Sequence, residues 1–149
     1  MRAIVQRVLE SFVSIDGRIV GKISKGFNVL IGICNEDTDA DVSYIAKKII
    51  NLRIFDDEEG KMNKSLKDVD GEILVISQFT LYGDARKGNR PSFINAKSGN
   101  EAKVLYEKLI YLLKKEIEVV ETGEFGAEME VCIINDGPVT ILLDSKKLF

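Results

Sequence analysis

The order of apolar patterns along the chain is the feature that most restricts its fold. Apolar runs of strand length dominate, and several are separated by turns too short to hold a helix. Only two segments repeat apolar residues at helical spacing. Strands joined by short turns pair antiparallel, and helices then cover a face of the sheet. We therefore expect a single α+β domain over residues 1–149, with a mostly antiparallel, barrel-like sheet and two main helices packed on it.

The expected strands begin near the N-terminus, where residues from Ala3 to Ile33 read as a series of strands. Asp16-Gly17 is a strong hairpin signal in this series, because both central residues of a type I′ turn require positive φ. Later strands are expected at Glu72–Phe79, Val119–Thr122, Glu128–Ile134 and Val139–Leu143.

The first expected helix follows Thr38, a good capping residue, and carries Asp39 and Asp41 in its first turn, where negative charge is favoured. Ser98, Asn100 and Glu101 precede the second helix, which ends near Glu116. Both have one apolar face. The residues expected on these inward faces are Val42, Ile45, Ala46, Ile49 and Ile50 in the first helix, and Ala102, Leu105, Leu109, Leu112 and Leu113 in the second.

The absence of histidine removes several enzyme classes. Among 149 residues there are 21 basic and 24 acidic side chains and no histidine, giving a net charge of −3. A Ser-His-Asp triad, a Cys-His pair, a zinc site with imidazole ligands and the usual neutral-pH proton shuttle are therefore excluded. Cys34 and Cys132 each lie in an apolar run, where we expect both to be buried packing residues, since free cysteine behaves as a small hydrophobe.

The location of the protein is expected to be the cytoplasm. Charged residues interrupt the first apolar residues too early for a signal peptide. No stretch approaches the ~18 consecutive apolar residues of a membrane span.

Three segments are polar where a pure scaffold has no need of polar groups. The first is Ser77-Gln78-Phe79-Thr80, which continues to Asp84 at the end of an expected buried strand. Hydroxyl and amide groups at the end of a strand can present donors to a ligand. The alternative is that Ser77 and Thr80 satisfy local backbone groups where the strand turns.

The second segment is Asn135-Asp136-Gly137-Pro138-Val139-Thr140. Its default interpretation is a turn between two strands. Glycine also lets the backbone approach a ligand closely, and an X-Pro bond can be cis, which turns neighbouring carbonyl oxygens the same way. The residues themselves leave the isomer open.

The third segment is the most basic stretch of this acidic chain. It runs from Arg86 to Phe93 and contains Lys87 and Arg90. These cations can hold phosphates from an exposed loop. The alternative is an ordinary solvated charge run.

Together these segments resemble the D-aminoacyl-tRNA deacylase family along essentially the whole chain. Two motifs carry the resemblance, Ser77-Gln78-Phe79-Thr80-Leu81 and Asn135-Asp136-Gly137-Pro138-Val139-Thr140. Asn89 stands where the family pattern suggests a basic residue. The supporting matches are Asn51-Leu52-Arg53-Ile54-Phe55, Gly60-Lys61-Met62-Asn63 and residues 86–93.

The resemblance implies a homodimeric hydrolase, without metal or cofactor, whose active sites lie at the subunit interface. It cleaves the ester between a D-amino acid and the terminal ribose of tRNA, and removes glycine from mischarged tRNA. The substrate ribose hydroxyl assists water, so a strong protein nucleophile is not required.

The resemblance also implies roles for individual residues. Ser77, Gln78, Phe79 and Thr80 are the catalytic segment. The backbone around Phe79 and Thr80 stabilises the oxyanion, and the Thr80 hydroxyl either orients groups or acts as a nucleophile.

The resemblance implies that the Gly137-Pro138 bond is cis, and that this motif reaches into the partner's active site and excludes L-aminoacyl groups. Arg7, Asn135 and Thr140 support this motif. The tRNA contacts are Arg86, Lys87 and Arg90. Arg7 is otherwise an exposed strand cation.

Two other functions remain open from the sequence. One is a sister deacylase with a trans Gly-Pro bond and a relaxed chiral filter. The other is a dimeric RNA-binding or ligand-binding module without catalysis.

Overall fold

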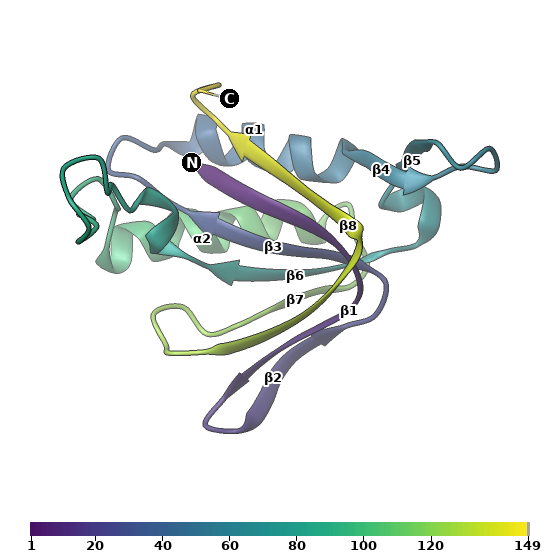
Figure 1. Ribbon diagram of the computed structural model, residues 1–149, viewed down its shortest axis with the longest axis horizontal. Coiled ribbons are helices and arrows are strands. Elements are labelled where there is room, and N and C mark those ends of the chain that lie inside the picture. The colour runs from purple at the N-terminus through teal and green to yellow at the C-terminus, as the bar shows by residue number, and fades with distance from the viewer. Residues whose placement is uncertain (149) are drawn as a thin grey trace.

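The structure is a computed structural model that describes residues 1–148, and it combines one curved sheet with two long helices (Figure 1). The α+β fold with a barrel-like sheet is therefore confirmed. The strands are β1 (Arg2–Ile15), β2 (Arg18–Ile23), β3 (Gly26–Gly32), β4 (Arg53–Asp56), β5 (Met62–Ser65), β6 (Glu72–Ser77), β7 (Val120–Thr122) and β8 (Glu130–Asp144). The helices are α1 (Asp39–Asn51) and α2 (Gly99–Lys114), with 3-10 turns η1 (Lys67–Val69) and η2 (Phe79–Tyr82).

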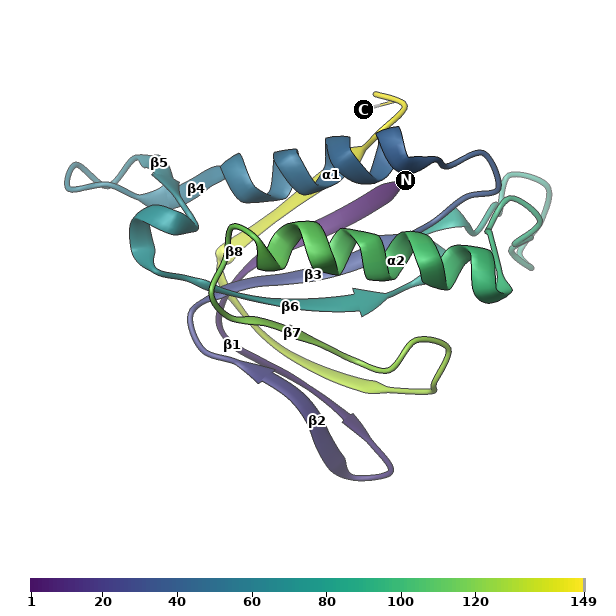
Figure 2. The same ribbon diagram turned by 180° about the vertical axis from the view of Figure 1, so that it is seen from behind.

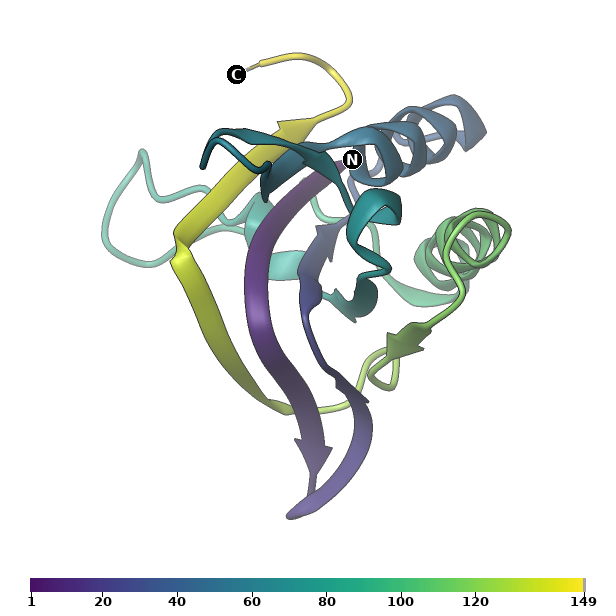
Figure 3. The ribbon, with the colours of Figure 1, turned by 90° about the vertical axis from the view of Figure 1, so that its right-hand side faces the viewer.

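Strand β1 organises the sheet, because three strands pair with it. It pairs antiparallel with β3 along its first half, with β2 along its second half, and with β8 along nearly its whole length. β3 and β6 are parallel, as are β6 and β7, so the sheet is mixed. The order β2-β1-β3-β6-β7 curls until β2 and β7 approach each other (Figure 3). A Cβ added at Gly21 of β2 would lie 2.5 Å from the Thr122 carbonyl oxygen, so only glycine permits this approach.

Two apolar clusters fill the two faces of the sheet. Phe27, Val29 and Ile31 of β3 pack beneath α1 and α2, which lie side by side on one face (Figure 2). Leu30 points the other way, into a smaller cluster inside the curl. β3 is apolar on both faces for this reason, as its continuous apolar run predicted. The smaller cluster consists of Val8, Val13, Ile23, Leu74 and Ile76.

Local sequence signals account for the element boundaries near the N-terminus. Asp16 and Gly17 have φ of 50° and 76°, which confirms the primed hairpin turn. Thr38 is the N-cap of α1, with a capping box to Asp41, and all five residues expected on the inner face of this helix are buried.

Four local expectations were wrong. β6 ends at Ser77 instead of Phe79, because the chain turns into η2. In α2, Tyr106 is buried although it was not expected on the inward face. Leu105 and Leu112, which were expected there, are half-buried. Cys34 is buried but Cys132 is exposed, because it lies on an outward-facing position of β8.

The fourth concerns the segment around Pro138. The default interpretation as a turn between two strands fails, because β8 continues through it from Glu130 to Asp144. The chain bends there without reversing, and the register with β1 shifts on either side of Val8.

Among the described residues, no helix has the length and apolar character needed to cross a membrane.

Candidate active site

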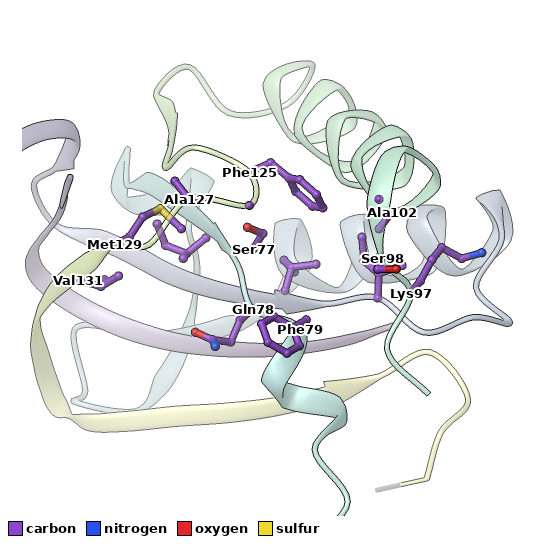
Figure 4. A pocket seen from close by; sticks show the side chains of 15 residues that line it. Ser77, Gln78, Phe79, Lys97, Ser98, Ala102, Phe125, Ala127, Met129 and Val131 are labelled. Atoms are coloured by element: carbon purple, nitrogen blue, oxygen red, sulfur yellow. The ribbon is translucent and has the colours of Figure 1, made fainter. Parts of the chain in front are cut away.

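A cavity of about 350 Å³ opens where β6 ends, and three separate parts of the chain form its walls (Figure 4). The end of β6 contributes Ser77, Gln78 and Phe79, and the loop between β7 and β8 contributes Phe125 and Met129. The start of α2 and the two residues before it contribute Lys97, Ser98, Gly99 and Ala102. Ile31, Ile33 and Ile76 lie at its base. The cavity is mostly apolar, with a few polar side chains at the end of β6 and before α2, as is usual in small-molecule sites.

Two backbone N–H groups shortly after β6 have no hydrogen-bond acceptor in the described part of the chain. The Gln78 N–H donates to the Ile31 carbonyl at 2.7 Å, the last bond of the parallel pairing before η2 begins. The next two N–H groups, those of Phe79 and Thr80, have no acceptor within residues 1–148, since both lie in the first turn of η2. The Gln78 side-chain amide donates to the Thr80 hydroxyl oxygen. Phe79 lines the cavity and Thr80 follows it directly outside the lining, so the motif places two unpaired backbone donors and one oriented hydroxyl next to the cavity.

Arg2 holds η2 against the sheet. Its Nη1 donates to the Leu81 carbonyl at 2.9 Å, its Nε pairs with Asp144 at 3.1 Å, and its guanidinium lies 4.6 Å from the centre of the Tyr82 ring. Because Arg2 and Asp144 are paired residues of β1 and β8, Arg2 fixes η2 to the sheet.

The wall opposite Phe79 rests on a buried tyrosine. The Tyr106 hydroxyl donates to the Val75 carbonyl at 2.7 Å, and its ring contacts Phe125 with the two centroids 5.5 Å apart. Burial raises the pKa of Tyr106 above its ordinary value, so the hydroxyl stays a donor. Tyr106 thereby ties α2, β6 and the β7–β8 loop together behind the cavity.

These wall residues were missed by sequence reasoning. Phe125, Met129 and the start of α2 carry no chemical motif. One signal was available, since Gly123 and Gly126 flank Phe125 and indicate a tight, closely approached loop.

The segment Asn135–Thr140 forms a bend in β8. The Gly137-Pro138 peptide bond is cis, and Gly137 has φ of 116°, which L side chains rarely adopt. The Asn135 amide donates to the Thr140 hydroxyl oxygen at 3.1 Å, which closes the base of the bend. Gly137 and Pro138 themselves are exposed.

Arg7 lies beneath this bend and is buried, so the alternative that it is an exposed strand cation is wrong. Its Nη1 donates to the Ile54 carbonyl at 2.7 Å. Its Nε lies 3.1 Å from Asp136 Oδ2, an ion pair without hydrogen-bond alignment. A Cβ added at Gly137 would lie 3.1 Å from Arg7 Nη2, so the guanidinium fills the space beneath the glycine.

The bend is far from the cavity of its own chain, and none of residues 135–140 lines that cavity. Arg7, beside the bend, aligns with Phe27 and then with Ile73 near the start of β6, whereas the cavity lies at Ser77. Four residues along a strand and three strand spacings across the sheet separate them by roughly 20 Å. The two motifs therefore cannot act on the same small group within one copy.

The basic segment forms an exposed loop whose base is closed. The Asp84 and Ser92 main chains exchange hydrogen bonds of 2.8 and 2.9 Å. Arg86 makes two side-chain bonds to the Asp84 carboxylate, and they hold the pKa of Asp84 at about 2, below its ordinary range. Lys87 and Arg90 are exposed and have no ion pair within the described part of the chain. Two of the three expected phosphate contacts are thus uncompensated cations.

A metal site is not apparent at these segments. Within residues 1–148, no group of three or more Asp, Glu, Cys or His side chains is placed to hold an ion.

Comparison with known proteins identifies the family. Residues 4–144 match the family D-Tyr-tRNA(Tyr) deacylase. The D-aminoacyl-tRNA deacylases of Clostridium novyi (strain NT) and Clostridium botulinum (strain Hall) are 66% and 63% identical to the chain over 149 residues, all of each protein.

Two solved structures have the same fold. The c-Myc DNA Unwinding Element Binding Protein superposes with a TM-score of 0.92 at 44% identity, covering 97% of this chain and 98% of that one. A probable eukaryotic D-amino acid tRNA deacylase superposes with a TM-score of 0.81 at 17% identity over 95% and 97% of the two chains, a likeness of fold alone. With its full-length relatives and with both motifs in place, the chain belongs to the D-Tyr-tRNA(Tyr) deacylase family.

Proposed function

We propose that this chain is a D-aminoacyl-tRNA deacylase, which hydrolyses the ester between a D-amino acid and the terminal ribose of tRNA, and that it also releases glycine from mischarged tRNA. The full-length identity to deacylases supports the activity. The single structural observation that carries it is the cavity at the end of β6, which Phe79 lines and beside which the N–H groups of Phe79 and Thr80 are unpaired. The enzyme acts in the cytoplasm, as one domain over residues 1–149.

The chemistry needs alignment and charge stabilisation more than a nucleophile. An aminoacyl ester is an activated acyl group, and attack by water places negative charge on its carbonyl oxygen. The N–H groups of Phe79 and Thr80 are free to stabilise that oxygen, which is often the largest single contribution to catalysis. The ribose hydroxyl next to the ester positions or activates the water.

The Thr80 hydroxyl orients groups in this scheme. No histidine is present to activate it, and it already accepts a hydrogen bond from Gln78. Thr80→Val keeps the shape and removes the hydroxyl. We expect single-turnover hydrolysis to slow, about tenfold, because the backbone donors remain. A rate within twofold of wild type removes Thr80 from essential chemistry.

The terminal adenosine occupies the cavity. Its apolar walls suit the faces of a base, with Phe79 on one side and Phe125 on the other. Ser77 lies between them and offers a hydroxyl to the ribose or the base.

A second copy completes each site. The bend at Gly137-Pro138 is exposed and roughly 20 Å from the cavity of its own chain, so it can serve only another chain's cavity. β8 pairs with β1 along one edge, and among the described residues no strand pairs with its other edge. The β8 residues Ile134 and Leu142 are large, apolar and exposed, at 47% and 54%. A two-fold homodimer that buries this strand brings the bend of one copy toward the other.

Main-chain atoms of the bend then form the chiral filter. Their carbonyl oxygens hold the substrate amino group and crowd the side of Cα where an L side chain projects. Glycine passes the filter because it has no side chain. Arg7 fixes the backbone from beneath, which a filter made of backbone requires. Lys87 and Arg90 contact tRNA phosphates, and Arg86 joins them through its remaining donors.

The deciding experiment measures hydrolysis of D-Tyr-tRNA, L-Tyr-tRNA and Gly-tRNA by wild type and by Pro138→Ala. Wild type is expected to cleave the D and glycyl esters and spare the L ester. Pro138→Ala is expected to gain attack on the L ester or to lose activity. An unchanged rate and preference refutes the filter, and protection of all three esters supports a binding module instead.

A further inference from the structure

The surface next to the cavity mouth contains an apolar patch that the chemistry above does not use. It consists of Phe93 and Ile94, which are 37% and 79% exposed, beside Phe79 at 56%. The Phe93 ring meets the Phe79 ring edge-on with centroids 5.1 Å apart. Phe79 also lines the cavity, so the patch continues directly outward from the proposed adenosine site.

The exposure of this patch is not caused by a loose backbone. The Ile94 carbonyl accepts a hydrogen bond from the Asn35 side chain at 2.8 Å, and the Asn35 N–H donates to the Asn95 carbonyl at 3.1 Å. The Ala96 N–H donates to the Phe93 carbonyl at 2.9 Å. Ile94 is thus held out in solvent by a fixed main chain, which is costly unless something covers it.

The positive charge beside the patch indicates a partner that carries negative charge. Lys87 and Arg90 lie in the loop whose closed base, at Asp84 and Ser92, immediately precedes Phe93. In a chain of net charge −3, this is a local pair of uncompensated cations. An aromatic ring, an apolar neighbour and free cations are the combination that binds single-stranded nucleic acid, where bases stack and phosphates pair with Lys and Arg.

We propose that Phe93 and Ile94 form a stacking platform for the nucleotide preceding the terminal adenosine of tRNA, while Lys87 and Arg90 contact the phosphates of the same strand. The inference rests on the proposed function, because it places the adenosine in the cavity. The enzyme then binds the single-stranded 3′ end of tRNA through its last two nucleotides, of which the penultimate one is a cytidine. It adds affinity for tRNA without touching the reacting ester.

The test compares D-tyrosyl-tRNA with the minimal substrate D-tyrosyl-adenosine, which ends at the cavity. The measured quantity is the ratio of kcat/KM for the two substrates, because loss of stability lowers both values together. Phe93→Leu keeps apolar bulk but removes the ring face. It should lower the ratio about fivefold or more, as does the loss of one stacked base. Ile94→Ala should lower it two- to threefold.

Two further variants separate stacking from other effects. Ile19→Ala truncates a similarly exposed residue, 52% exposed on β2, and should leave the ratio unchanged. Phe93→Trp should restore the ratio, and because the chain has no tryptophan it gives a single fluorescent reporter. Its emission should be quenched by the trinucleotide cytidylyl-cytidylyl-adenosine and not by adenosine alone.

Several results overturn the platform. One is a ratio within twofold of wild type in Phe93→Leu, and another is equal quenching by adenosine and the trinucleotide. A third is conversion of Ile94→Ala from dimer to monomer in sedimentation, which assigns the patch to the subunit contact. If wild type cleaves neither ester, the proposed function fails, and the Phe93→Trp titration still decides for or against the platform.

Discussion

Replacing Arg7 by methionine tests whether a buried cation holds the chiral filter in place. The guanidinium donates to the Ile54 carbonyl at 2.7 Å and pairs with Asp136 at 3.1 Å. Losing a buried charged bond to a carbonyl costs about 1.5–3 kcal/mol. Asp136 is one-third exposed and regains water, so its lost ion pair adds only about 1 kcal/mol or less. Methionine fills much of the same volume, so we expect a loss of about 2–4 kcal/mol.

In a chain of 149 residues this loss lowers the Tm by about 10 °C, measurable by calorimetry. The proposed function adds an effect on activity beyond the loss of stability, because the bend relaxes at the main-chain atoms assigned to hold the substrate. A misplacement near 1 Å can cost about 10²-fold in rate. We therefore expect the ratio of D-Tyr-tRNA to L-Tyr-tRNA hydrolysis to fall by at least tenfold.

The control is Asp41→Asn, which removes an ion pair with Lys146 at 2.9 Å, beyond the end of β8 at Asp144 and away from the bend at Gly137-Pro138. It should be destabilised yet keep the wild-type stereochemical preference. If Arg7→Met keeps that preference despite a lower Tm, Arg7 serves folding alone and the bracing argument fails. If the Tm changes by less than about 2 °C, the energetic reasoning is wrong as well.

Three further expectations follow from the same contacts. Tyr106→Phe removes the bond to the Val75 carbonyl and should lower the Tm by about 3 °C while raising KM more than it lowers kcat; equal effects on both constants would contradict a wall-positioning role. Burial opposes ionisation of Asp41, but hydrogen bonds, foremost that from Lys146, hold its pKa well below 3.8; the stabilisation is present at neutral pH and lost as the pH falls below about 4, so the Tm gap between wild type and Asp41→Asn should narrow there. Neutralising Lys87 and Arg90 together as glutamines should flatten the fall of sub-saturating kcat/KM with rising salt, and an unchanged slope would move the phosphate contacts elsewhere.

The parts of the fold predicted from sequence are those determined by local chemistry. The Asp16-Gly17 turn and the Thr38 cap each depend on a few adjacent residues, and both were predicted in place. The parallel pairing of β3 with β6 was not predicted, because it depends on how α1 crosses the sheet. The continuity of β8 through Pro138 was missed, because Gly-Pro usually ends a strand. The contact of Arg7 with Asp136, which supports the bend, exists only in the folded chain.

The candidate site divides in the same way. Ser77 to Thr80 could be singled out because their types are unusual at the end of a buried strand. The residues alone also fitted a turn with local hydrogen bonds, and only the resemblance gave them a role. Phe125 and Tyr106 are ordinary aromatic residues in sequence. Their place behind the cavity exists only once α2 and the β7–β8 loop are brought together, so no local pattern reveals it.

The distance between the bend of β8 and the cavity of its own chain has a consequence for accuracy. In the proposed homodimer each cavity takes its chiral filter from the other chain, so stereochemical fidelity depends on protein concentration through mass action. Dilution below the dissociation constant of that dimer leaves monomers whose cavities lack the filter. A mutation that weakens this dimer then lowers the discrimination between D- and L-aminoacyl esters even where it leaves the stability of the fold unchanged. The rate of wrong hydrolysis rises with the fraction of monomer.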